Sequence, residues 1–348
     1  MHVVGARPNF VKAAPVISTI GDRYKQIIIH TGQHYDKNLS GDFFDALEIP
    51  DPDEHLGIGS GRHGEQTAKV MIEIEKNLFK YAPDLLIVYG DVNSTLGATI
   101  AAAKMNIKVA HIESGLRSFD RKMPEEINRL LVDRISDYHF VTEKSGVENL
   151  INEGHSRSGI FFVGNTMIDS LFKMESRLDD IAEEYVLMTM HRPSNVDNKG
   201  GLEKIIEICS NANLKVKFPM HPRTEKSFQK FSLLDKLKSI SNVEILPPVG
   251  YFEFASFLKN SLVVVTDSGG IQEETTSLGV PCLTLRNNTE RPITTEEGTN
   301  TLVSTAQETV EKIMSIKKGN YKTGKVPYLW DGLAGQRIFD VIDRIILA

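Results

Sequence analysis

The chain has 348 residues, of which 41% are hydrophobic and 25% are charged, and its formal net charge is −6. This length suits two domains of about 150 to 200 residues, with enough apolar material for a core in each. A net negative charge argues against a protein that binds nucleic acid or lies on a membrane surface, because both need a dominant basic face.

The cysteine content and the hydropathy pattern further restrict the class of protein that this sequence can encode. The two cysteines, Cys209 and Cys282, lie in apolar stretches without CxxC spacing, so we expect buried free thiols and no metal site. No run of about 18 apolar residues is present and the chain enters a strand at once, so neither a membrane span nor a signal peptide is expected. We therefore expect a cytoplasmic protein.

Short β-branched runs alternate with helical patterns along the chain, which predicts βαβ units around parallel sheets. Strands are expected at 2–4, 26–30, 85–89, 108–112, 137–141 and 160–163, and then at 185–190, 215–219, 243–246, 262–266 and 282–285. Helices are expected at 11–20, 65–79, 167–178 and 335–347. The pattern predicts an α/β protein with two Rossmann-like domains, residues 1–165 and 166–334, with the helix of 335–348 packing on the first domain.

The stretch Gly5–Pro15, GARPNFVKAAP, joins the first strand to a helix through a glycine turn. Such a turn directs backbone N–H groups and the positive end of the helix dipole outward, so it can bind an anion. Arg7 and Lys12 would strengthen that site. The alternative is a surface loop with two solvated cations.

A second glycine motif, residues 59–64, matches the G-x-G-x-x-G fingerprint of dinucleotide-binding proteins. It follows a polar stretch instead of a predicted strand. We therefore expect a loop that leads into the helix of 65–79, and no nicotinamide site.

Carboxylates follow two predicted strands of the first half, where ligands of parallel sheets bind. Asp91 comes just after the strand of 85–89, and Glu113 directly follows the strand of 108–112. Glu125 lies in the first turn of a helix that begins near Pro124. An alternative for Glu125 is that it only complements the helix dipole and pairs with Arg129 at i,i+4.

The second half supplies cations and a small-residue turn. His191 and Arg192 follow one strand, and His221 follows the next, although a single histidine at a strand end is more often structural than catalytic. Ser268-Gly269-Gly270 joins a strand to a helix, and only small residues let a diphosphate approach such a backbone. Glu274 could accept hydrogen bonds from the hydroxyls of a ribose. Arg291 lies in a polar loop. These features predict a nucleotide-diphosphate site.

Seven motifs in this order resemble the non-hydrolysing UDP-N-acetylglucosamine 2-epimerases. The motifs are GARPNFVKAAP (5–15), GDVNST (90–95), HIESGLRS (111–118), MPEEINR (123–129), the His-Arg pair (191–192), TDSGGIQEE (266–274) and NNTERP (287–292). The resemblance implies a glycosyltransferase-B-like architecture with the active site in the cleft between the domains, and a homodimer. It also implies interconversion of UDP-N-acetylglucosamine and UDP-N-acetylmannosamine without an added cofactor.

The same resemblance assigns roles to residues. It implies that the catalytic groups are Asp91, Glu113, Glu125 and His191. The residues it implies for binding the UDP-sugar are Arg7, Lys12, Arg129, Arg192, His221, Phe254, Ser268, Gly269, Gly270, Glu274 and Arg291. At a second, regulatory substrate site of the family, Gln33 and His34 match, whereas Asp36 and Glu65 replace a Gln and an Arg.

The chemistry explains why acids and cations are needed together. The hydrogen on C2 of the sugar is not adjacent to a carbonyl, so its removal is assisted by departure of UDP from C1. Two faces of C2 then require two acid/base groups. The alternatives are a hydrolysing epimerase that releases UDP and N-acetylmannosamine, a glycosyltransferase of the same architecture, and a non-catalytic sugar-nucleotide sensor.

Overall fold

The computed structural model describes residues 1–32, 47–175, 177–179 and 183–347. The chain forms two compact units, which are described separately here. Unit 1 consists of Met1–Lys173 and Tyr328–Ala348, and unit 2 consists of Met174–Pro327. The chain leaves unit 1 inside helix α7 (Thr166–Glu175).

Unit 1 is built on a seven-stranded parallel sheet of order β3-β2-β1-β4-β5-β6-β7. The strands are β1 (His2–Val4), β2 (Ile28–His30), β3 (Glu54–His55), β4 (Leu85–Tyr89), β5 (Lys108–Ser114), β6 (Tyr138–Val141) and β7 (Ile160–Phe162). The strand order reverses between β1 and β4, so the carboxyl ends of these two strands and of β5 form the expected ligand-binding edge.

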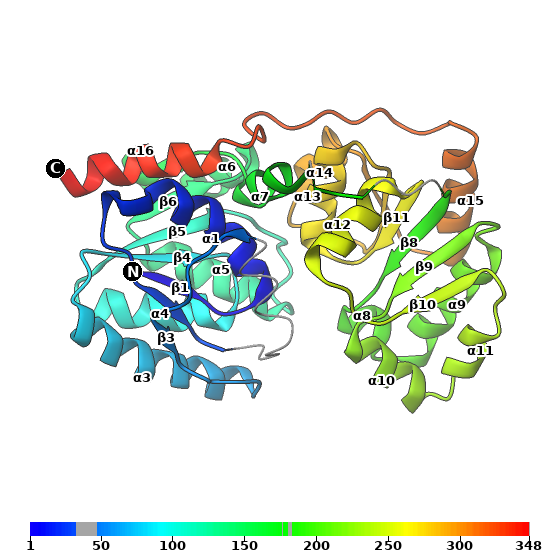
Figure 1. Ribbon diagram of the computed structural model, residues 1–348, viewed down its shortest axis with the longest axis horizontal. Coiled ribbons are helices and arrows are strands. Elements are labelled where there is room, and N and C mark those ends of the chain that lie inside the picture. Colours follow the sequence, from blue (N-terminus) through cyan, green and yellow to red (C-terminus); the bar gives the residue numbers. More distant parts are fainter. Residues whose placement is uncertain (33–46, 176, 180–182, 348) are drawn as a thin grey trace. The chain divides into compact units, whose positions relative to one another are not determined.

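The helices of unit 1 cover both faces of its sheet. They are α1 (Arg7–Ile20), α3 (His63–Tyr81), α4 (Asn93–Lys104), α5 (Pro124–Ile135), α6 (Lys144–Asn152), α7 and α16 (Ala334–Leu347), with 3-10 turns η1 (Gly21–Arg23) and η2 (Arg157–Gly159). Figure 1 shows α1 and α16 on one face of the sheet and α3 and α4 on the other.

Unit 2 has a six-stranded parallel sheet of order β10-β9-β8-β11-β12-β13. Its strands are β8 (Tyr185–Thr189), β9 (Lys215–Pro219), β10 (Val243–Leu246), β11 (Val263–Thr266), β12 (Cys282–Leu285) and β13 (Asn300–Val303). Its helices are α8 (Pro193–Val196), α9 (Lys199–Asn211), α10 (Pro222–Lys230), α11 (Leu234–Lys238), α12 (Tyr251–Asn260), α13 (Gly269–Leu278), α14 (Pro292–Glu296) and α15 (Ala306–Lys317). Two parallel-sheet α/β units confirm the predicted fold class.

Three features of the fold differ from the sequence-based expectation. Helix α1 begins at Arg7, four residues earlier than predicted, because Asn9 Oδ1 accepts from the backbone N–H groups of Gly5 and Ala6. Helix α3 begins at His63, so it includes the end of the second glycine motif. The strands β3 and β13 were not predicted, since both are short and contain polar residues.

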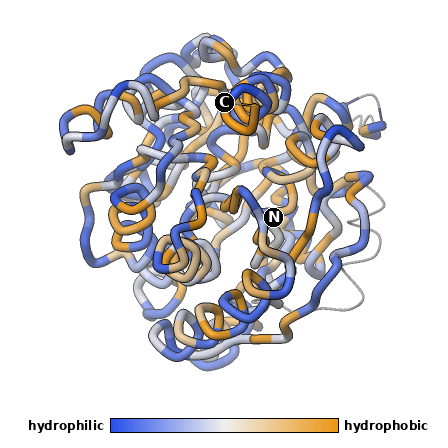
Figure 2. The backbone as a smooth tube through the Cα atoms, turned by 90° about the vertical axis from the view of Figure 1, so that its left-hand side faces the viewer, coloured by the Kyte–Doolittle hydropathy of each residue, from blue (hydrophilic) through white to orange (hydrophobic). Residues whose placement is uncertain are grey.

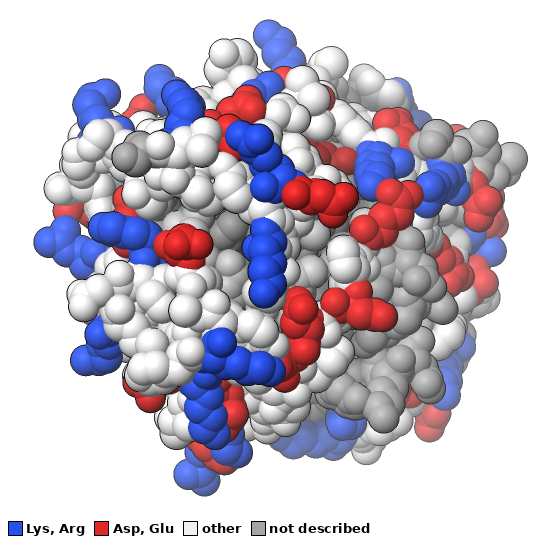
Figure 3. Space-filling view, turned by 60° about the vertical axis from the view of Figure 1, so that its left-hand side comes forward, with Lys and Arg blue, Asp and Glu red and all other residues white. Residues whose placement is uncertain are grey.

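The buried residues lie mainly between each sheet and its helices. In unit 2 one cluster joins β8, β9 and β11 to helices such as α9, through side chains that include Met188, Ile205 and Phe218. Figure 2 shows the corresponding alternation of hydrophilic and hydrophobic residues along the helices. On the face drawn in Figure 3, acidic and basic side chains are interspersed. No helix among the described residues combines the length and the apolarity that crossing a bilayer requires.

The C-terminal segment packs onto unit 1 through buried polar contacts. The Trp330 indole, which is fully buried, donates to the backbone carbonyl of Thr142 at 2.9 Å. At the start of α16, the backbone N–H of Gly335 donates to Asp169 Oδ2 of α7 at 2.7 Å. A side chain at Gly335 would collide with the carbonyl of Pro15, because an added Cβ would lie 2.9 Å from that oxygen. Glycine therefore lets α16 approach α1 closely.

Asp169 makes the stability of this junction depend on pH. Burial raises the pKa of Asp169 to about 6, although backbone N–H groups of α16 oppose the shift. The folded state therefore retains a proton that the unfolded chain has released, so the free energy of unfolding should fall as the pH rises from about 4 to about 6. Two pKa units correspond to about 3 kcal/mol. Asp169→Asn should remove most of this slope in urea titrations at a series of pH values.

The control is Asp340→Asn, which changes an exposed carboxylate on α16 and should leave the slope in place. An Asp169→Asn variant with an unchanged pH dependence would contradict the assignment.

Candidate functional site

The turn after β1 is packed tightly against the start of α4. A Cβ on Gly5 would lie 2.3 Å from Ser94 Oγ, so only glycine allows this approach. Ser94 Oγ also lies 2.7 Å from Thr31 Oγ1, and Asn9 Nδ2 donates to the backbone carbonyl of Tyr89 at 2.9 Å. These contacts fix α1 beside the end of β4. The side chain of Arg7 lies outside the described part of the structure, so its role stays a prediction.

Lys12 and Glu113 form a buried ion pair at this edge of the sheet. Lys12 Nζ lies 2.5 Å from Glu113 Oε2, and the side chains are 7% and 3% exposed. A Cβ on Gly90 would come within 3.0 Å of Lys12 Nζ, so the glycine after β4 makes room for the ammonium group. Lys12 is therefore not a solvated surface cation.

The backbone at Glu113 has an unusual conformation. Glu113 has φ +69, and the pairing of β5 with β6 shifts register between Ile112 and Ser114. A positive φ is unfavourable for a residue with a side chain and is often found at functional sites. The bulge interrupts the regular alternation of β5 at the residue that carries the carboxylate.

Asp91 contacts residues on the buried side of α5. Arg129 Nη2 donates to Asp91 Oδ2 at 2.6 Å, and Arg129 Nη1 donates to Glu126 Oε2 at 2.7 Å. Asn128 Nδ2 donates to the backbone carbonyl of Asp91 at 2.8 Å. These contacts hold both the carboxylate and the backbone of Asp91 in place.

Glu125 differs from its neighbour Glu126. Glu126 is buried and accepts from the backbone N–H groups of Ser118 and Phe119, each at 2.9 Å. Glu125 is partly exposed, and among the described residues it makes no hydrogen bond or ion pair. The alternative i,i+4 pair between Glu125 and Arg129 is thus not formed.

In unit 2, Asp267 at the end of β11 organises the loop after β8. Its carboxylate accepts from the backbone N–H of His191 at 3.1 Å, from that of Arg192 at 3.0 Å and from Asn195 Nδ2 at 3.0 Å. Burial lowers the pKa of the His191 imidazole, while the charge of Asp267 acts in the opposite direction. The His191 and His221 rings lie with their centres 5.7 Å apart.

Three arginines surround one buried carboxylate, Glu290. Arg286 Nη2 and Arg291 Nη1 each lie 2.7 Å from its oxygens, and Arg192 Nη2 lies at 3.4 Å. Arg291 Nε also contacts Glu273 Oε2 at 2.8 Å. Although burial acts to raise it, the charges of the three arginines hold the pKa of Glu290 well below its usual range. Three guanidinium groups thus converge on one buried carboxylate, and oriented guanidinium groups are suited to an anionic ligand.

The Ser268-Gly269-Gly270 turn lies beside this arginine cluster. A Cβ on Gly269 would lie 2.6 Å from Arg291 Nη1, so glycine lets the guanidinium reach the first turn of α13. Further along α13, the buried Glu274 accepts from the Tyr251 hydroxyl at 2.7 Å. Phe254, on α12, is half-buried and packs against an apolar cluster that contains Tyr185.

The structure brings the predicted residues into local groups within each unit. Lys12 contacts Glu113, Arg129 contacts Asp91, His191 lies near His221, and Arg291 packs against Gly269. Sequence reasoning missed the buried carboxylates that hold these groups, which are Glu126, Asp267, Glu273 and Glu290. All four stand inside motifs that were recognised, and their position beside charged or strand-end residues is the signal that could have found them. Gln33, His34 and Asp36 lie outside the described residues, and Glu65 is paired with Lys69 at 2.7 Å.

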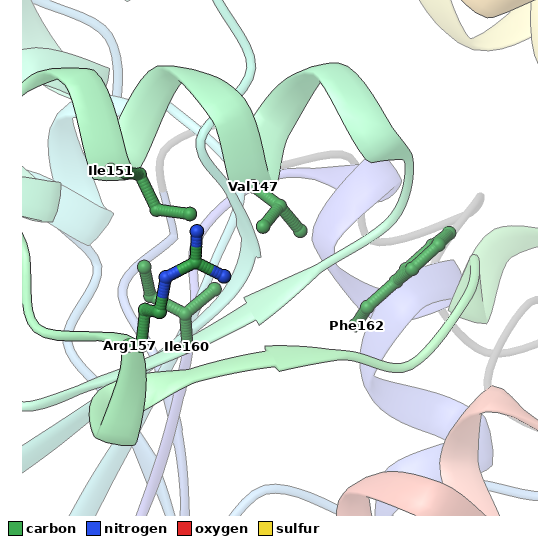
Figure 4. Close-up of a pocket in the computed structure, with 5 residues that line it drawn as sticks. All are labelled: Val147, Ile151, Arg157, Ile160 and Phe162. Atoms are coloured by element: carbon green, nitrogen blue, oxygen red, sulfur yellow. The ribbon is translucent and has the colours of Figure 1, made fainter.

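A shallow pocket lies elsewhere in unit 1, between α6 and β7 (Figure 4). Its lining is apolar apart from one guanidinium, and it consists of Val147, Ile151, Arg157, Ile160 and Phe162. None of the predicted site residues lines this pocket.

Fold and site together define a two-unit Rossmann-like α/β protein with acidic groups at the strand ends of one unit and an arginine cluster in the other. The sequence model of the UDP-N-acetylglucosamine 2-epimerase family matches residues 20–343. A UDP-N-acetylglucosamine 2-epimerase homolog of Methanococcus maripaludis is 46% identical over 99% of both chains. A UDP-2,3-diacetamido-2,3-dideoxy-D-glucuronate 2-epimerase of Pseudomonas aeruginosa is 38% identical, also over 99% of both.

A solved structure agrees with these sequence comparisons. The UDP-GlcNAc 2-epimerase of Methanocaldococcus jannaschii, in complex with UDP-GlcNAc and UDP, superposes with a TM-score of 0.91 at 43% identity, over 99% of each chain. The chain therefore belongs to the UDP-N-acetylglucosamine 2-epimerase family.

The arginine cluster should depend on Glu290 for stability. Glu290→Gln leaves three guanidinium groups around a neutral amide, and breaking a buried ion pair in this way costs about 3 to 5 kcal/mol. We expect the free energy of unfolding of unit 2, measured by urea titration with a probe in that unit, to fall by an amount in this range.

Glu244→Gln is the matched control, because Glu244 of β10 pairs with Lys215 at 3.0 Å on a partly exposed surface. Its loss should stay within about 1 kcal/mol. Equal losses for the two variants would contradict the importance of the buried cluster.

Proposed function

We propose that the protein is a non-hydrolysing epimerase that interconverts UDP-N-acetylglucosamine and UDP-N-acetylmannosamine. The observation that carries this proposal is the pair of acidic strand ends in unit 1, Asp91 and the Lys12-paired Glu113, in a chain whose other unit holds a cluster of three arginines. Family membership and the UDP-GlcNAc-bound relative support the choice of a UDP-sugar.

In the proposed reaction, the arginine cluster and the Ser268–Gly270 turn hold the diphosphate. Arg192 and Arg291 stabilise the negative charge that develops as the bond between C1 and the diphosphate oxygen breaks. The electron pair of that bond leaves with UDP, and a carboxylate takes the proton from C2. The electrons of the C2–H bond then form the double bond of 2-acetamidoglucal.

The return step requires a proton from the opposite face of C2. UDP adds back to C1 as this proton is delivered, and the product is the C2 epimer. We assign the proton transfers to the set Asp91, Glu113 and Glu125, because two faces need two separate groups. Glu113 is fixed by Lys12, whereas Glu125 makes no ion pair within the described residues.

Other activities lead to different products from the same substrate. A hydrolysing epimerase would release UDP and free N-acetylmannosamine, and a glycosyltransferase would leave UDP-N-acetylglucosamine unchanged when no acceptor is present. A diacetamido uronate substrate, as in the name of the Pseudomonas aeruginosa relative, is a further candidate.

Incubation with UDP-N-acetylglucosamine alone in deuterium oxide separates these activities. We expect proton NMR to show the anomeric signal of a second UDP-sugar with deuterium at C2, and phosphorus NMR to show intact diphosphate esters. Glu113→Gln should bind UDP as the wild type does and lose turnover by about a hundredfold or more, the usual contribution of a positioned acid or base.

Accumulation of free UDP together with product would establish hydrolysis instead. Retention of protium at C2 would exclude the proposed proton exchange with solvent. An unchanged substrate would direct the test to diacetamido uronate sugars or to a glycosyl acceptor.

We also propose a homodimer formed through the α3–α5 side of unit 1. Large apolar side chains are exposed there, with Ile72 and Phe79 of α3 exposed by 55% and 73%, and Leu131 of α5 by 47%. Ile72 and Phe79 are two helical turns apart and so share one face of α3. Exposed apolar side chains that gather in this way are typical of protein interfaces.

Phe79→Glu should shift the protein from dimer to monomer in light scattering after gel filtration, because a charge would be buried at the interface. Leu333→Glu is the control, since Leu333 is 55% exposed but lies next to α16. A wild-type protein with the mass of one chain would contradict the proposal.

A further inference from the structure

Asp133 on α5 is a buried carboxylate whose polar contacts come from residues close to Glu113 in the chain. Its oxygens accept from His111 Nδ1 at 2.6 Å, from Ser114 Oγ at 2.5 Å and from the backbone N–H of Gly115 at 3.0 Å. Arg117 Nη1 lies 2.7 Å from the same carboxylate. The four donors come from positions two before and one, two and four after Glu113. No accessible surface remains on the Asp133 side chain.

The same network reaches the end of the neighbouring strand. His111 Nε2 lies 2.8 Å from the backbone carbonyl of Gly90, while its Nδ1 faces Asp133. The two ring nitrogens of His111 thus connect the Asp133 carboxylate to the residue that follows β4. Gly90 is the residue beside which Lys12 Nζ and Glu113 Oε1 lie. Asp133 thus fixes the strand ends on both sides of the Lys12–Glu113 pair.

The charges around Asp133 favour its ionised form. Burial by itself would raise the pKa of Asp133, but the charge and hydrogen bond of His111, the charge of Arg117 and the hydroxyl of Ser114 bring it below the usual value. His139 Nδ1 lies 3.1 Å from Ser114 Oγ, and Glu153 pairs with Arg117 at 2.6 Å. The network is therefore a buried set of charged hydrogen bonds, whose geometry is strict in a low-dielectric interior.

The backbone of Glu113 needs such a restraint. A carboxylate on a regular strand would follow the alternation of β5, whereas φ +69 at Glu113 turns the chain at the bulge. This conformation is unfavourable unless the surrounding structure enforces it. The hydrogen bonds from Ser114 and Gly115 to Asp133 hold the two residues that directly follow the bulge.

We propose that Asp133 is a positioning residue that sets the orientation of the Glu113 carboxylate by holding the β5 bulge and the Gly90 carbonyl. The proposal rests on the proposed function, because it concerns the efficiency of proton transfer at C2. A misplacement of a reacting group by about 1 Å can lower a rate a hundredfold. Loss of one hydrogen bond of the network should therefore reduce turnover more than binding.

Ser114→Ala is the sharpest test, because it removes one hydroxyl from the network and leaves every charge in place. We expect kcat for epimerisation, and the rate of deuterium incorporation at C2, to fall about tenfold or more. The dissociation constant for UDP should stay close to the wild-type value, whereas the melting temperature should fall by a few degrees because a buried carboxylate loses one donor. Ser114→Thr retains the hydroxyl and should recover most of the lost activity.

Ser136→Ala is the matched control, since its hydroxyl donates to the backbone carbonyl of Val132 at the end of α5 and not to the Asp133 carboxylate. It should leave kcat unchanged. Asp133→Asn, when it folds, should lower kcat further than Ser114→Ala with UDP binding retained. When it does not fold, Ser114→Ala decides alone.

A merely structural role predicts a different pattern. In that case Ser114→Ala would lower the melting temperature and leave kcat of the folded enzyme at the wild-type value, and this result would overturn the proposal. A wild-type protein that incorporates no deuterium at C2 would instead refute the proposed function, so the two failures are distinguishable.

Discussion

The structure depends on buried carboxylates that contact the segments following parallel strands. A buried carboxylate is very unfavourable unless cations and N–H groups surround it closely. Each such group therefore gathers several donors from different parts of the chain. Asp133 does so in unit 1, and Asp267 and Glu290 do so in unit 2. The groups that donate hydrogen bonds to these carboxylates belong to side chains and loops for which a chemical role is proposed.

This requirement gives the two units different electrostatic character. In unit 1, the cations Lys12 and Arg129 each have a close carboxylate partner, so two of the three proposed acid/base groups, Glu113 and Asp91, are paired with a cation. In unit 2, Arg192, Arg286 and Arg291 converge on the single carboxylate of Glu290. Several oriented guanidinium groups in one place suit a diphosphate, whereas a carboxylate that is paired with a cation suits a proton transfer that needs fixed geometry.

Much of the fold could be predicted from the sequence because both sheets are parallel and buried. Strands such as β4 (LLIVY) and β11 (VVVT) read as unbroken apolar runs, and the residues after them mark the binding edge. The start of α1 could not be placed, since it depends on the amide of Asn9. The strand β3 has two residues, Glu54 and His55, and it forms only by pairing with β2.

The buried carboxylates were harder to predict from the sequence than the side chains that donate to them. Glu125 and Glu126 are adjacent, and one helical step of about 100° places them in opposite environments. The inner side of α5 carries Glu126, Arg129 and Asp133, spaced at i, i+3 and i+7, and this spacing was the available signal. Charged residues in such positions usually lie on a solvated face. Their burial becomes evident only from the tertiary contacts with Ser114, Arg117 and Asp91.

The Lys12–Glu113 pair connects two roles that the sequence assigned separately, UDP binding and proton transfer. In the folded protein Lys12 is already paired with a carboxylate, so its charge is compensated before any ligand is bound. When Glu113 takes the C2 proton in the proposed reaction, it becomes neutral and the ammonium loses its anionic partner. At the same moment the departing UDP gains a negative charge. Both changes belong to one elimination step of the proposed reaction. The role in UDP binding that the resemblance implies for Lys12 would therefore be stronger in the transition state than in the ground state, which is the condition for an interaction to accelerate a reaction.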